Sequence, residues 1–266
     1  MTCMQPKAIF THSNLHAMNT LTAALMCAVF VFSLVAPELS AFAQEGGTVK
    51  KLRNRAEFSV VDTSGNTDLF TLSLKNTLEY KFRPDLMGTW NLSALYGEQD
   101  SDKNAERYST DLRFDYDLAT TYYSYLLGGW LRDRFAGFDH RYHIGPGLGR
   151  KFLIGPRHFL KAETGVNWTR EDYIEEGAED FLEGRIYGQY DFVVSEGNKF
   201  FQGLEYLLDF EDSDNYKIIS VTGVTSTLTR GLAIKVAYEI RYQNRPVPET
   251  VEKTDTTLSA SLVLSY

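Results

Sequence analysis

The feature that most limits what this chain can fold into is an alternation of apolar and polar residues that persists over unusually long segments. Over residues 70–82, apolar side chains stand at almost every second position, with Thr, Ser, Lys and Glu between them. The same pattern recurs at residues 232–242 and 258–266. A period of two places successive side chains on opposite faces of a β-strand. The chain after Gln44 is therefore predicted to be all β.

About twelve such segments follow one another along the chain. The predicted strands are residues 53–62, 69–82, 87–97, 107–118, 121–132, 140–152, 158–169, 181–193, 199–210, 216–227, 231–242 and 254–266. Strands of soluble proteins average about five or six residues, whereas strands that cross a bilayer at a tilt need about nine or more. The predicted lengths are those of transmembrane strands.

The connections between these segments alternate in length. Tight turns are predicted at Arg83-Pro84-Asp85, Ala119-Thr120, Gly155-Pro156, Glu196-Gly197-Asn198 and Thr229-Arg230. Longer polar loops are predicted at residues 97–106, 133–139, 170–180 and 243–253. Short turns at one end and longer loops at the other are typical of outer-membrane barrels, in which an even strand number leaves both termini in the periplasm. The sequence predicts an antiparallel up-and-down transmembrane β-barrel of about twelve strands.

A sheet that spans a lipid bilayer is expected to close into a barrel. In hydrocarbon every backbone N–H and C=O needs a protein partner, and an open sheet edge would leave a row of them unsatisfied. A closed barrel removes both edges and turns its apolar face outward to lipid and its polar face inward. The alternative is a soluble, lipocalin-like barrel that buries the apolar face instead.

The N-terminal residues predict a targeting segment. Residues 21–35 form a nearly unbroken apolar run, and a small-x-small signature ends at Ala43, before Gln44. We expect a signal peptide that starts at Met1 or Met18 and directs export through the Sec pathway; an uncleaved anchor is the alternative. The predicted organisation is a signal peptide at residues 1–43, a short periplasmic segment at 44–52 and the outer-membrane barrel at 53–266.

Cysteine usage and charge restrict the partners. Cys3 and Cys27 both precede the predicted cleavage site, so the exported protein would have no disulfide. The formal net charge of −8 argues against nucleic acid as a partner. The expected partners are outer-membrane lipid, lipopolysaccharide and the barrel-assembly machinery, which would recognise the alternating C-terminal strand that ends at Tyr266. A monomer in the Gram-negative outer membrane is expected.

Charged residues occupy the predicted inward-facing positions. The candidate lumen-lining residues are Arg55, Glu57, Lys75, Glu79, Asp111, Arg113, Lys161, Glu163, Arg185, Lys235, Glu239 and Arg241. Two interpretations remain open: a water-filled channel whose charges bias which solutes pass, or a lumen closed by paired charges. A barrel of about twelve strands lies between the filled small barrels and the open porins, so its size does not decide.

Signals of catalysis or metal binding are weak. The predicted mature chain has three histidines, and His140 beside Asp139, with Asp209 or Glu211 as further partners, is the one combination that suggests a surface hydrolase. The acidic loops have no calcium-loop spacing, so no metal ligands and no cofactor are assigned. Gly145, Gly147 and Gly149 stand at alternate strand positions, where relief of barrel curvature is the expected role.

Three short motifs carry a family resemblance. They are Thr-Ser-Gly-Asn-Thr-Asp at residues 63–68, Arg141 with the glycine-rich residues 144–149, and Pro246 and Pro248 ahead of Asp255. With these motifs, residues 50–266 resemble the family called domain of unknown function 481, whose members are often named salt-induced outer membrane proteins. The resemblance implies the outer-membrane location and the barrel fold, and it implies no activity.

The sequence thus predicts an outer-membrane barrel that is not an enzyme. Its expected role is a small passive channel, or a structural protein that responds to envelope stress such as salt. The alternative is a barrel hydrolase acting on lipid or peptide at the cell surface.

Overall fold

The structure, a computed structural model, describes residues 51–63, 69–100, 102–174, 177–247 and 252–266. The predicted signal peptide, the cleavage site at Ala43 and Gln44, and most of the motif at residues 63–68 lie outside this part of the chain. Within it, no helix is long and apolar enough to cross a membrane.

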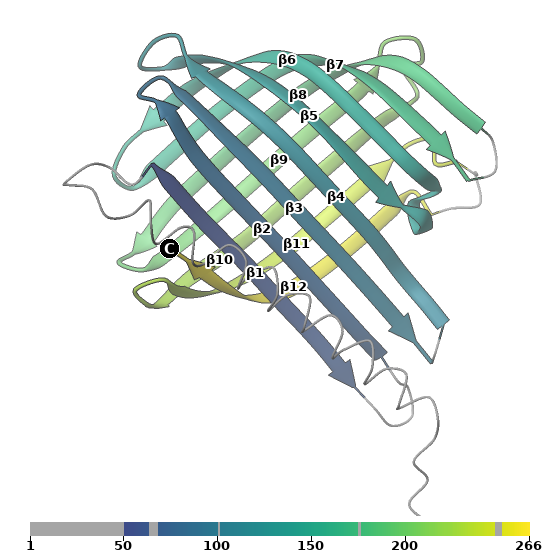
Figure 1. The fold of residues 1–266 in the computed structure, drawn as a ribbon, viewed down its shortest axis with the longest axis horizontal. Coiled ribbons are helices and arrows are strands. Elements are labelled where there is room, and N and C mark those ends of the chain that lie inside the picture. The colour runs from purple at the N-terminus through teal and green to yellow at the C-terminus, as the bar shows by residue number, and fades with distance from the viewer. Residues whose placement is uncertain (1–50, 64–68, 101, 175–176, 248–251) are drawn as a thin grey trace, which may run out of the picture. The chain divides into compact units, whose positions relative to one another are not determined.

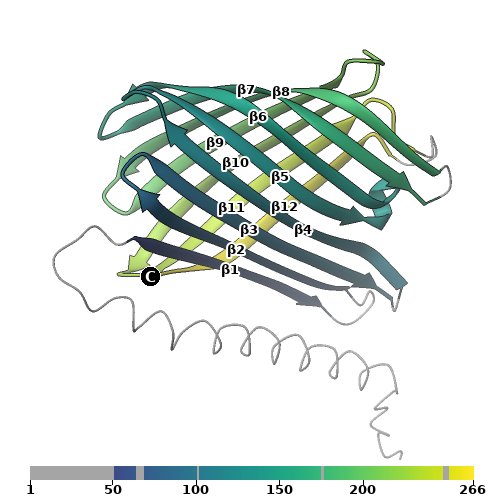
Figure 2. The same ribbon diagram turned by 45° about the horizontal axis from the view of Figure 1, so that its top comes forward.

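Twelve antiparallel strands close into a single barrel, as predicted (Figure 1). They are β1 (Leu52–Thr63), β2 (Leu69–Arg83), β3 (Leu86–Gln99), β4 (Asp102–Asp117), β5 (Tyr122–Asp133), β6 (Phe138–Ile154), β7 (His158–Tyr173), β8 (Gly177–Ser195), β9 (Asn198–Asp209), β10 (Tyr216–Thr229), β11 (Leu232–Gln243) and β12 (Thr254–Ser265). Each strand pairs with its neighbours in sequence, and β1 pairs with β12 to close the ring. The strands run side by side at a common tilt to the barrel axis (Figure 2).

The alternation in sequence becomes two different faces of the barrel wall. Apolar side chains at outward positions are exposed on the barrel surface, for example Leu148 and Ile186, both at 58%. Charged side chains at the positions between them are buried, for example Arg185 at 5% and Glu163 at 3%. This reversal of a soluble sheet is what a lipid environment requires, because apolar surface there carries no hydration cost.

Two of the predicted loops are wrong in their extent. Residues 97–106 and 170–180 were expected to be long loops, but β3 continues to Gln99 before β4 begins at Asp102, and β7 continues to Tyr173 before β8 begins at Gly177. Strand pairing still satisfies the backbone beyond the lipid, whereas the apolar alternation stops there because neither face meets hydrocarbon. The alternation therefore stops at the edge of the lipid, several residues before the strands themselves end. Residues 134–136 form one turn of 3-10 helix instead of loop.

The two ends of the barrel carry different connections, and the β1–β12 pairing that closes the ring is shorter than the pairing between the other strands. We call the end that holds the β2–β3, β4–β5, β6–β7, β8–β9 and β10–β11 connections the turn end, and the opposite end the loop end. The C-terminal residue lies at the turn end, where its backbone exchanges two 3.1 Å hydrogen bonds with Asn54. The β1–β12 register joins Arg55–Phe58 to Ser265–Leu262, four pairs, whereas β1 and β2 are paired from Leu52 to Thr63.

Candidate functional site: the lumen

The twelve predicted lumen residues lie on strand faces that meet inside the barrel. The ion pairs are Glu57 with Lys235 at 2.9 Å, Lys75 with Glu239 at 3.9 Å, Arg241 with Glu239, Glu79 with Arg53 at 3.6 Å, and Glu163 with Arg113, Lys161 and Arg185. The Asp111 carboxylate lies 3.4 Å from His143 Nε2. Arg55 forms no ion pair with any residue that the structure describes. Whether these residues line a conducting path stays a prediction.

Glu163 on β7 is the centre of a buried charge cluster. Arg113 on β4 donates two hydrogen bonds of 2.9 Å to its carboxylate, and Arg185 on β8 donates a third of 2.9 Å. Lys161 at 3.0 Å and the Tyr123 hydroxyl at 2.7 Å complete the set. The Glu163 side chain is 0% exposed. A buried carboxylate with this many donors is held firmly, because charge-assisted hydrogen bonds replace its lost hydration.

A second buried cluster, nearer the loop end, surrounds Glu171. Its carboxylate is bound by Lys217 of β10, lies 3.2 Å from Arg141 of β6 and accepts 2.7 Å from the Tyr173 hydroxyl. Arg141 also donates 2.7 Å to Glu183 on β8. Arg141, Glu171 and Lys217 are not among the predicted lumen residues, although alternation along β6, β7 and β10 places them on inward faces. Parity alone could have found them.

The rings of Tyr123 and Tyr125 on β5 pack against glycines of β6. A Cβ added to Gly147 would stand 2.2 Å from Tyr125 Cζ, and one added to Gly149 would stand 2.2 Å from Tyr123 Cζ. These two glycines therefore make room for tyrosine rings, a role that the sequence analysis missed. Gly145 differs, because its Cβ would lie 2.1 Å from the Val166 carbonyl oxygen, a close approach of neighbouring backbone that fits the predicted role in curvature.

We expect Gly147→Ala to lower the free energy of unfolding by about 1–3 kcal/mol, since the new methyl group would displace the Tyr125 ring. The matched control is Gly188→Ala on β8, where a Cβ meets nothing within 4 Å. The measurement is the urea concentration at which half of the barrel is unfolded. Folded and unfolded barrel are distinguished by their different gel mobility in unboiled samples. The double variant Gly147→Ala/Tyr125→Ala should lose less stability than the sum of its two single losses, because the clash is gone once the ring is removed. Equal midpoints for Gly147→Ala and Gly188→Ala would contradict the packing role.

The opposite wall of the lumen is much less filled. Lys75 on β2 faces inward toward Glu239, yet its side chain is 46% exposed. Arg55 on β1 and Thr257 on β12 are also inward-facing and exposed. Because β7 stands opposite β1 in the order of the ring, charged packing fills one side of the lumen and solvent reaches the other.

One ion pair reaches across this open side. Arg107 Nη1 of β4 lies 4.0 Å from Glu239 Oε1 of β11, five strands away around the ring. A small cavity of about 60 Å³ adjoins Arg107, Arg141 and Lys217 toward the loop end. Side chains of β4 and β11 therefore meet across the lumen at this level.

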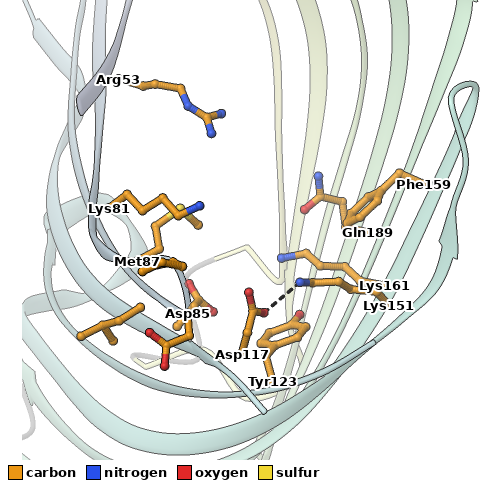
Figure 3. Close-up of a pocket in the computed structure, with 13 residues that line it drawn as sticks. Arg53, Lys81, Asp85, Met87, Asp117, Tyr123, Lys151, Phe159, Lys161 and Gln189 are labelled. Carbon is orange, nitrogen blue, oxygen red and sulfur yellow. Dashed lines mark hydrogen bonds and ion pairs between the residues drawn. The ribbon is translucent and has the colours of Figure 1, made fainter. Parts of the chain in front are cut away.

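A larger cavity of about 350 Å³ opens near the turn end (Figure 3). Arg53, Lys81 and Met87 stand on one wall, and Lys151, Lys161 and Gln189 stand on the other. Asp117 accepts a 2.9 Å hydrogen bond from Lys151 at its floor.

The histidines are dispersed over different surfaces. His140 lies 3.9 Å from Asp139 and accepts 3.1 Å from the Trp130 indole on the outer face. Its proposed partner Asp209 instead accepts from Asn215 at 3.1 Å and from the Glu211 backbone at 2.8 Å. No contact joins His140 to Asp209 in the part of the chain that the structure describes. The described residues also contain no group of three His, Cys, Asp or Glu side chains that could hold a metal ion.

The amino-acid sequence matches one protein family and one bacterial relative. A family profile described as "Protein of unknown function, DUF481" matches residues 56–266. The "Uncharacterized protein YdiY" of Escherichia coli K12 is 28% identical over 74% of this chain and 77% of its own length.

Solved outer-membrane barrels share the fold at low sequence identity. The COG4313 outer membrane channel of Pseudomonas putida F1 superposes with a TM-score of 0.53 at 11% identity, over 84% of this chain and 97% of that one. The translocator domain of the autotransporter NalP of Neisseria meningitidis gives a TM-score of 0.52 at 13% identity, over 98% and 99%. These likenesses carry the fold alone.

Proposed function

The chain belongs to the DUF481 family, whose function is unknown, and we propose from its lumen that it is a narrow passive channel of the bacterial outer membrane. The closed twelve-strand fold is that of an outer-membrane β-barrel. The solutes would be ions and small polar molecules that cross by diffusion down their gradient.

The observation that carries the proposal is the uneven filling of the lumen. Two inward-facing charges, Glu163 on β7 and Arg185 on β8, are nearly inaccessible, at 0% and 6% side-chain exposure. Lys75, on the opposite wall, is inward-facing and 46% exposed. An inward side chain can be this exposed only if water-sized space lies beside it, so a hydrated path along β12, β1 and β2 is supported.

The charges on this path favour small solutes. Lys75, Glu239 and Arg107 form a chain of ion pairs that narrows the path, and a solute must pass or displace them. Rings of side-chain charge of this kind select by size and sign. Because both signs occur, only weak selectivity between cations and anions is expected.

Single-channel recording in planar bilayers tests the proposal. Refolded barrel is first checked for a heat-modifiable gel band, which shows that it is folded. Stable steps of small conductance are the expected result. A heat-modifiable barrel that gives no conductance at any voltage would overturn the channel and would leave a structural role for the filled lumen.

Lys75→Glu is expected to shift the selectivity toward cations, with the permeability ratio changing roughly threefold, because it places a second carboxylate beside Glu239 on the open path. The measurement is the reversal potential in a salt gradient. Lys103→Glu makes the same charge change at the exposed tip of the β3–β4 hairpin and should leave the ratio close to that of the wild type. A ratio that Lys75→Glu leaves unchanged would place the ionic path elsewhere.

The proposal also includes how the barrel reaches its place. Export through the Sec pathway, removal of residues 1–43, recognition of the C-terminal strand by the assembly machinery and function as a monomer are all parts of it. The resemblance to salt-induced proteins adds that osmotic stress would be the condition of use. If growth of whole cells in high salt raises both the expression of this protein and the conductance of their outer membranes, the role in osmotic stress is supported.

A further inference from the structure

The cavity at the turn end has the volume of a small-molecule site. Its volume of about 350 Å³ lies within the range of about 300–1,000 Å³ that ligand pockets occupy. In Figure 3 the side chains of Arg53 and Lys81 extend into it from one wall, and Lys161 and Gln189 extend from the other. A ligand there would be held between two walls of the lumen.

The acids that line this cavity already have cationic partners. Asp85 lies 3.3 Å from Arg83, Asp115 lies 2.7 Å from Arg113, and Asp117 lies 2.9 Å from Lys151. Neither Arg83 nor Arg113 lines the cavity, so two of these carboxylates are neutralised from outside it.

The cations of the cavity are not matched in the same way. Lys81 forms no ion pair with any residue that the structure describes. Arg53, 67% exposed, has Glu79 at 3.6 Å as its only ion-pair partner among the described residues. Lys161 lies 3.0 Å from Glu163, a carboxylate that also binds Arg113 and Arg185. Arg113 pairs with Asp115 as well, and Arg185 with Glu205. The cavity therefore holds an excess of positive charge within a chain whose formal net charge is −8.

Apolar groups stand beside these cations. Met87 and Phe159 line the cavity from opposite walls, and the Gln189 amide supplies both a donor and an acceptor (Figure 3). Basic groups next to apolar surface fit a ligand that has an anionic end and a carbon skeleton, which a bare inorganic ion lacks.

We propose that this cavity is a binding site for a small organic anion bearing carboxylate or phosphate groups. Arg53 and Lys81 hold the charge, and Met87 and Phe159 contact the carbon skeleton. The site would be reached from the turn end, which is expected to face the periplasm. The proposal does not depend on whether the lumen conducts, because binding needs access from one end only.

Isothermal titration calorimetry of the refolded mature barrel in zwitterionic detergent tests the site. The probes are citrate, glycerol 3-phosphate and inorganic phosphate, with uncharged sorbitol as the blank. The expected result is one bound citrate or glycerol 3-phosphate per barrel, weakened by added salt because the contacts are ionic.

The matched variants are Arg53→Gln/Lys81→Gln, both at exposed side chains, and Arg230→Gln in the exposed β10–β11 turn at the same end, outside the cavity. The double variant should weaken binding of the organic anion about tenfold or more, and Arg230→Gln should change it less than about twofold. Unchanged affinity in the double variant, or no binding of either organic probe below about 10 mM, would overturn the site. Equal affinity for inorganic phosphate would overturn the organic part, since the apolar wall would then contribute nothing.

Discussion

Glu163→Gln is expected to lower the free energy of unfolding by about 3–5 kcal/mol, the largest loss of any single substitution considered for this barrel. The change removes the one negative charge that Arg113, Arg185 and Lys161 share, and it leaves these cations with too few carboxylates around a position where the Glu163 side chain is 0% exposed. A buried charge without its partner is far more costly than a buried pair. Urea unfolding in lipid vesicles, followed by the mobility of unboiled samples, measures the loss.

The control for this result is Glu79→Gln. Glu79 faces the same lumen, but its one ion pair with a described residue, Arg53, spans 3.6 Å, and the side chains are 29% exposed for Glu79 and 67% for Arg53. Pairs of that kind contribute about 0–1 kcal/mol. Similar urea midpoints for the two variants would mean that the Glu163 cluster does not stabilise the barrel. If Glu163→Gln fails to fold, Glu163→Asp keeps the charge and should recover a heat-modifiable band.

Ile186→Arg is expected to cost about 2–4 kcal/mol, because it places a cation on the lipid face near the middle of β8. Ile186 is 58% exposed on the outer wall, so in the membrane its side chain contacts hydrocarbon. The measurement is again the urea midpoint in lipid vesicles, together with the yield of folded barrel.

The same residue introduced on the other face should be tolerated. Thr257 on β12 is exposed and inward-facing, and it stands directly across from Glu239 on β11. An arginine at this position would lie beside a carboxylate and in contact with water. The free energy of unfolding of Thr257→Arg should therefore be within about 0.5 kcal/mol of that of the parent protein. A larger loss for Thr257→Arg than for Ile186→Arg would contradict the assignment of the two faces.

The strands were predictable because a bilayer imposes one simple rule along their whole length. The strand expected at residues 69–82 is Leu69–Arg83, and the one expected at 216–227 is Tyr216–Thr229. Where the rule ends, so does the prediction. The outer part of β8 begins at Gly177, in a run of acidic residues in water, and its alternation is no longer visible in the sequence.

The contacts inside the lumen could not be predicted from the alternation. Parity places Arg113 and Glu163 on inward faces, but these residues lie on strands three apart in the ring. Whether such strands meet depends on the tilt and stagger of the closed barrel, which are properties of the whole ring. The fit of Tyr125 over Gly147 depends on the same stagger. The sequence indicates which side chains enter the lumen, and the closed ring determines which of them touch.

The short register between β1 and β12 has a consequence for how the ring can open. Four residue pairs and the two backbone bonds of Asn54 join these strands, fewer than join any consecutive pair. Local opening requires the least free energy where the fewest contacts must break. Separation at this seam would expose the hydrated wall of β12, β1 and β2 to the acyl chains beside it. The seam is thus the line along which a molecule could pass sideways between the water of the lumen and the lipid, without the ring as a whole coming apart.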